Sequence, residues 1–100
     1  MGSRLELHNK LLEHADYVYF QPPSGMKMSY PCIVYSRNTK HREYGNDKSY
    51  IRMQGYQVTA IDRNPDSFLA DDIEDTFPYC AISQYFVNDN LHHTTLQLYY

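Results

Sequence analysis

The triplet Asn88-Asp89-Asn90 separates two runs that each have the composition of a β-strand, Cys80 to Val87 and Leu91 to Tyr100. Asparagine and aspartate tolerate left-handed backbone conformations, which the tightest turns between antiparallel strands require. The flanking runs contain aromatic and β-branched side chains, which favour strands. The sequence therefore predicts a β-hairpin over residues 80–100.

Three further strands are predicted earlier in the chain. Tyr17 to Phe20 is a short β-prone run that ends at a proline-rich turn. Cys32 to Tyr35 has the short, apolar pattern of a buried strand. Tyr50 to Ile61 alternates in the manner of a longer strand, with Gly55 at the position of a bulge where the alternation changes face. Residues 32–61 are thus expected to form a long hairpin.

The connection inside this hairpin is predicted to be a long exposed loop at about residues 38–49. This stretch is polar and charged, and it contains the turn-prone sequence Gly45-Asn46-Asp47. Such a composition is typical of a loop at the surface of a domain.

Two segments have helical patterns. Ser3 is suited to cap the first helix, whose predicted apolar positions are Leu5, Leu7, Leu11, Leu12 and Ala15. The second is predicted to start at Asn64-Pro65-Asp66 and to stop at Pro78. Its apolar stripe recurs every four residues, at Leu69, Ile73 and Phe77.

These elements predict a single small α+β domain over residues 1–100, in the order α-β-β-β-α-β-β. We expect a mainly antiparallel sheet packed by two helices. A chain of 100 residues has room for one hydrophobic core, and 42% apolar residues with 21% charged residues is an ordinary globular balance.

Charge is distributed unevenly along the chain. The net charge of −3 disfavours binding to duplex nucleic acid, which usually requires a basic face. Basic residues nevertheless gather between residues 37 and 52, and acidic residues between 62 and 75. The simplest interpretation is two solvated surfaces, and the alternative is a head-to-tail contact between copies of the chain. The candidate contact residues are Arg37, Lys40, Arg42, Tyr44, Lys48, Asp71, Asp72 and Asp75.

No pattern predicts an enzyme, a cofactor or a metal site. His92 and His93 are adjacent in a predicted strand, so they should point to opposite faces and cannot hold one ion together. The acids of the second helix are better explained as a solvated face than as paired catalytic carboxylates. Cys32 and Cys80 lie in apolar runs without metal-binding spacing, and we expect two buried thiols.

Neither a membrane span nor the apolar core of a signal peptide is found in the sequence. This pattern predicts folding in a reducing cytoplasm.

Several segments resemble small tail-terminator or tail-completion proteins of long-tailed bacteriophages, in the same element order and over nearly the whole chain. The resemblance lies in residues 18–23, 28–35, 56–62 with 64–66, and 89–100. These segments are strand and turn patterns without a catalytic signature.

The resemblance implies a structural virion protein, located at the tail or neck and assembled in the host cytoplasm. Its implied partners are other copies of itself in a ring, expected to be hexameric, the tail-tube protein and the head-tail connector protein. DNA would meet it only by passing through the ring. The alternatives are another head-to-tail connector (neck) protein, a small cytosolic adaptor or inhibitor that binds one protein, and a minor metal-dependent hydrolase.

Overall fold

The computed structural model describes residues 3–46 and 49–100, and for residues 39–52 it describes the backbone path alone. The elements follow the predicted order, so the α+β class is confirmed. They are α1 (Arg4–Leu12), β1 (Tyr17–Phe20), β2 (Cys32–Asn46), β3 (Ser49–Asp62), α2 (Leu69–Thr76), β4 (Cys80–Asn88) and β5 (Leu91–Tyr99).

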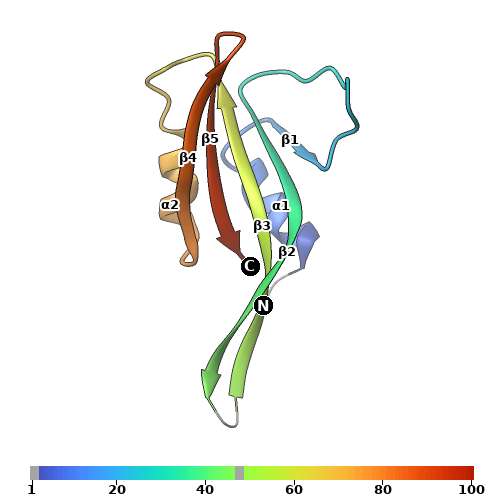
Figure 1. Ribbon diagram of the computed structural model, residues 1–100, viewed down its shortest axis with the longest axis vertical. Coiled ribbons are helices and arrows are strands. Elements are labelled where there is room, and N and C mark those ends of the chain that lie inside the picture. Colours follow the sequence, from blue (N-terminus) through green and yellow to red (C-terminus); the bar gives the residue numbers. More distant parts are fainter. Residues whose placement is uncertain (1–2, 47–48) are drawn as a thin grey trace.

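The five strands form one sheet in the order β1-β2-β3-β5-β4. Every neighbouring pair is antiparallel except β1 and β2, which are parallel. Both helices cover the same face of this sheet (Figure 1). Tyr35, Val58 and Leu96 are register partners across the three central strands and are all fully buried. Because register partners project to the same side, this row faces the helices.

Helix α1 contributes Leu7 and Leu11 to the core, and both are fully buried. The predicted cap is confirmed, since the Ser3 hydroxyl accepts a hydrogen bond from the Glu6 backbone N–H at 3.1 Å. The predicted apolar face was too wide, because the Leu5 and Leu12 side chains are 65% and 42% exposed. A nine-residue helix that contacts a sheet on one side buries only the stripe of residues spaced four apart.

Helix α2 begins later than predicted. The segment before it forms a turn in which the Asn64 side-chain oxygen accepts a hydrogen bond from the Asp66 N–H at 3.0 Å. Asparagine competes for backbone donors in this way, which delays the first helical turn until Leu69. The predicted stripe is otherwise confirmed, because Ile73 and Phe77 are buried in the core.

The predicted loop at residues 38–49 is wrong over its described part. Strand β2 continues to Asn46, and β3 begins at Ser49. A backbone ladder does not require apolar side chains, so a polar composition cannot by itself distinguish an unburied strand from a loop.

The predicted bulge lies at the expected level of the hairpin but in the opposite strand. Arg37 is opposite Tyr56 and His41 is opposite Gln54, so residues 38–40 of β2 share the single position facing Gly55. The bulge marks the point at which the hairpin leaves the sheet. The register of β3 with β5 ends at Gly55, and one residue further on Gln54 and Tyr100 exchange the last two backbone hydrogen bonds, of 3.1 and 3.0 Å.

Beyond this point the two strands continue alone as a ribbon, which we define as residues 42–46 and 49–53. Figure 1 shows the ribbon projecting past the end of β5. The molecule consequently measures 49 × 26 × 22 Å.

Candidate functional site

Strand β4 forms one outer edge of the sheet and is exposed along nearly its whole length. Its sequence from Cys80 to Asn88 contains no charged residue and no proline. Every residue from Ala81 to Asn88 is exposed, including four large apolar or aromatic side chains: Ile82, Tyr85, Phe86 and Val87. Natural edge strands are usually protected by charges, prolines or shortness, so β4 is an open edge for most of its length.

The backbone of β4 has donors and acceptors on its outer side. Asp89 and Asn90 both have positive φ, 53° and 62°, and form the two-residue turn that the sequence predicted. Such a turn pairs Asn88 with Leu91. Because antiparallel strands direct alternate residues toward their partner, Tyr85 and Val87 direct their N–H and C=O groups away from β5.

Only the beginning of this edge is protected. The Glu74 carboxylate of α2 accepts a hydrogen bond from the Ile82 N–H at 2.9 Å. A register shift between Ile82 and Gln84 also bends the strand at this level. The remaining segment, residues 84–88, is what we call the open edge.

The opposite edge of the sheet is protected along β1 and as far as Arg37 of β2. Strand β1 has four residues and is followed by Gln21 and then by Pro22-Pro23. The Gln21 N–H donates to the Tyr35 carbonyl at 2.9 Å, and the Gln21 side chain accepts from the Arg37 N–H at 3.2 Å. The two outer edges of this sheet therefore differ in length and in chemistry.

The acidic candidate residues lie beside the open edge. Asp71, Asp72 and Asp75 are exposed on α2, which packs next to β4 (Figure 1). Arg37 is exposed on β2, and strands β3 and β5 lie between β2 and β4. The other basic-side candidates lie outside what the structure describes: for Lys40, Arg42 and Tyr44 it describes the backbone alone, and Lys48 is not among the described residues. The acidic helix and the basic strand thus occupy different sides of one subunit.

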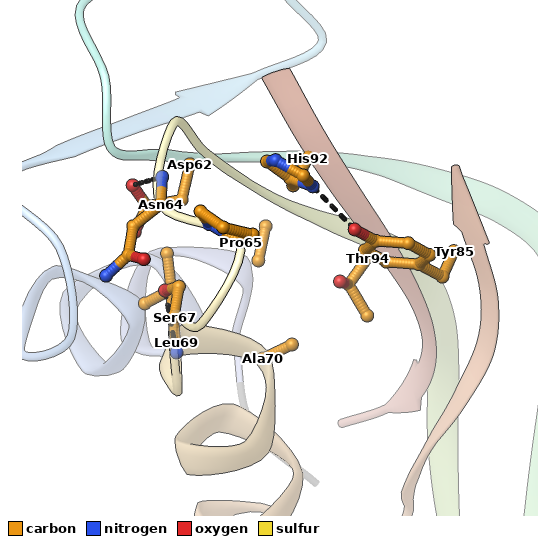
Figure 2. A pocket seen from close by; sticks show the side chains of 10 residues that line it. Asp62, Asn64, Pro65, Ser67, Leu69, Ala70, Tyr85, His92 and Thr94 are labelled. Atoms are coloured by element: carbon orange, nitrogen blue, oxygen red, sulfur yellow. Dashed lines mark hydrogen bonds between the residues drawn. The ribbon is translucent and has the colours of Figure 1, made fainter. Parts of the chain in front are cut away.

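A small hollow of about 60 Å³ lies between α2 and the β4–β5 hairpin. Figure 2 shows Tyr85 and His92 side by side at its rim, with the hydroxyl of Tyr85 2.5 Å from Nδ1 of His92. Asp62 also lines the hollow, but its carboxylate accepts a hydrogen bond from the Asn64 N–H at 3.0 Å. This carboxylate therefore holds the turn before α2, and the volume would accept only water-sized molecules.

The two histidines behave as predicted for neighbours in a strand. His92 contacts Tyr85, whereas the His93 ring stacks on Phe86 with centroids 4.6 Å apart, and Tyr85 and Phe86 are successive residues of β4. Within the described residues, no group of three or more His, Cys, Asp or Glu side chains is placed to hold a metal ion.

A second, wider hollow of about 240 Å³ lies where the ribbon leaves the sheet. Tyr100 is central to it: its hydroxyl donates to the Glu6 carboxylate, and the Lys10 ammonium lies 4.9 Å from its ring centroid. Burial, reinforced by the Glu6 hydrogen bond, raises the pKa of Tyr100. The remaining lining residues are Met53, Thr76, Phe77, Pro78, Tyr79 and Tyr99. The sequence did not indicate this aromatic hollow, because its walls come from both helices, from β3 and from the C-terminal end of β5.

The two cysteines are in the reduced form and differ in burial. Cys32 is fully buried, as predicted, and burial raises its pKa to about 11. Cys80 is only partly buried, because it lies on the edge strand; desolvation first and the Glu74 charge second raise its pKa to about 12. Both thiols are protonated at neutral pH, so neither is an activated nucleophile.

In the described part of the chain, no helix is long and apolar enough to cross a membrane. Neither the protein-family models nor the curated proteins that were searched match this chain.

Proposed function

We propose that this protein is a structural virion protein: a tail-terminator or tail-completion subunit that assembles as a ring on the end of a phage tail tube. The ring, with a hexamer as the expected size, stops growth of the tube and joins it to the head connector. The proposal rests on the resemblance of the strand and turn segments to that family. The structural observation that carries it is the open edge of β4.

An open, uncharged edge strand is a ready template for adding a strand from another protein. Monomeric proteins usually avoid such an edge strand, because it promotes association between chains. In this chain the edge bears Tyr85, Phe86 and Val87, of which tyrosine and phenylalanine are enriched at protein interfaces. These properties support assembly by stoichiometric contact.

The unequal edges of the sheet support a cyclic arrangement. A contact between two different surfaces of the same chain is heterologous, and it closes into a ring when the rotation between subunits divides a full turn. The β4 side of the sheet carries an acidic helix and the β2 side carries the basic strand. This polarity favours head-to-tail packing over a two-fold dimer.

The projecting ribbon supports contact with a second protein. In the family that the chain resembles, the connection between the two strands of this hairpin commonly reaches toward the tail tube or its lumen. A paired ribbon loses less conformational entropy on docking than an unpaired loop of the same length.

The mass of the purified protein, measured by light scattering across concentrations and with tail tubes that lack their terminal ring, tests the proposal. We expect a discrete ring on tube ends. A protein that stays monomeric and ignores tubes at every concentration would overturn the proposal in favour of a cytosolic adaptor. Binding to isolated head connectors without binding to tube ends would instead assign it to the neck.

A further inference from the structure

We propose that the open edge of β4 is filled by the outer edge of β2 from a second copy of this chain. In this arrangement the basic residues of that β2 lie beside the acidic face of α2. The inference rests on the proposed self-assembly and specifies the two surfaces that make it.

The acceptor is defined by its backbone. Tyr85 and Val87 direct their N–H and C=O groups outward, and in the described sheet no strand lies on that side of β4. Their side chains are 55% and 53% exposed, so an added strand would cover apolar surface as well as form hydrogen bonds. Removal of such surface from water is the main favourable term in association.

The donor is the part of β2 that β1 does not reach. The pairing of β1 with β2 ends at Phe20 and Tyr35, and Gln21 then occupies the next positions through its backbone and side chain. From residue 39 to Asn46, β3 is the only strand beside β2 in the described sheet. At about 3.3 Å per residue, these eight residues are long enough to pair with the whole open edge, residues 84–88.

Charge selects this donor over a second β4. Pairing two β4 strands about a two-fold axis would bring together two copies of α2, each with Asp71, Asp72 and Asp75 exposed. Like charges held close together disfavour such an interface. The β2 sequence from Arg37 to Asn46 instead carries three basic residues, Arg37, Lys40 and Arg42, against the single acid Glu43. A second copy therefore supplies both the complementary charge and a strand edge with no further strand beside it in the described sheet.

The backbone part of the proposal is tested with Val87→Pro, which removes an outward N–H without breaking the ladder to β5. Assembly of the full chain on tail tubes should weaken at least tenfold, while circular dichroism and thermal unfolding of the subunit stay close to wild type. Val87→Thr, which keeps the N–H, is the matched control and should assemble. Wild-type assembly by a folded Val87→Pro variant would overturn the proposal.

The charge part is tested by exchanging the charges of β2 and α2. This test does not depend on how well the proline variant folds. The double variants Lys40→Glu/Arg42→Glu and Asp71→Lys/Asp75→Lys should each fail to assemble alone, because like charges then face each other. An equimolar mixture should assemble with the two variants alternating, because each remade contact pairs opposite charges.

The charge exchange also distinguishes the β2-to-β4 contact from a different contact between copies and from the absence of self-assembly. A mixture that remains unassembled, or double variants that assemble alone, would overturn the β2-to-β4 contact while leaving self-assembly intact. Failure of the wild-type chain to assemble at all would overturn the proposed function together with this inference.

Discussion

The Glu74 carboxylate of α2 accepts a hydrogen bond from the backbone N–H of Ile82 at 2.9 Å, so a helix side chain satisfies an outer donor of the edge strand. Alanine at position 74 removes the acceptor and returns this donor to solvent. We expect Glu74→Ala to lower the free energy of unfolding by about 1 kcal/mol, measured by urea denaturation.

Asp75→Ala is the control for this change, because Asp75 is an exposed acid on the same helix. Its effect should stay within about 0.5 kcal/mol. Equal losses from the two variants would mean that the charge, and not the Ile82 contact, sets the stability.

Two adjacent leucines of α1 should respond very differently to truncation. Leu11 is fully buried in the core, whereas Leu12 is 42% exposed. Leu11→Ala should cost about 2–5 kcal/mol, because it leaves a cavity among side chains of the sheet and α2. Leu12→Ala should cost less than about 1 kcal/mol, since little apolar surface is lost. Similar midpoints in urea for both variants would contradict the one-sided packing of α1.

The contact between His8 and Tyr35 should make stability depend on pH. Nδ1 of His8 lies 2.7 Å from the Tyr35 hydroxyl, which also accepts a hydrogen bond from Arg4 at 3.2 Å. Desolvation first and the Arg4 charge second lower the pKa of His8 from its ordinary value of 6.5. The folded state thus disfavours protonated His8. The stabilisation that neutral His8 gives to the folded state is complete above pH 6.5 and is lost as the pH falls through the lowered pKa.

His8→Gln should therefore lose less stability than the wild type between pH 7 and pH 5. Proton NMR titration should place the His8 pKa below 6.5 in the folded protein, and Arg4→Gln should move it upward. A titration midpoint above 6.5 would contradict this arrangement.

The turn between β4 and β5 should discriminate among residues at position 90. Asn90 has φ of 62°, a left-handed conformation that costs most non-glycine residues about 1–2 kcal/mol. We expect Asn90→Ala to destabilise the protein by about 1 kcal/mol and Asn90→Gly to be neutral or stabilising. Asn9→Ala, the same substitution at an exposed position inside α1, should be neutral or slightly stabilising. Thermal unfolding of the three variants measures the differences.

Local patterns were sufficient for most of the secondary structure. The Ser3 cap, the Ile73 and Phe77 stripe and the left-handed turn at Asp89-Asn90 depend on residues close in sequence, so the amino-acid types determine them directly. Errors arose where a local signal was ambiguous. The polar residues after Arg37 are compatible with a loop and with a two-stranded ribbon, and Leu12 is apolar but lies off the packed stripe.

The number, type and order of the elements could be predicted from residue patterns, together with the separation of basic and acidic residues along the chain. Tertiary structure alone decided which strand became the outer edge, because strand order depends on contacts between segments far apart in sequence. It therefore also decided that Tyr85 and Val87 are exposed, and that the acidic helix lies beside them. The candidate interface is a product of that arrangement, since an uncharged run with apolar and aromatic residues, such as Cys80 to Asn88, is compatible with an inner strand as well as with an outer edge.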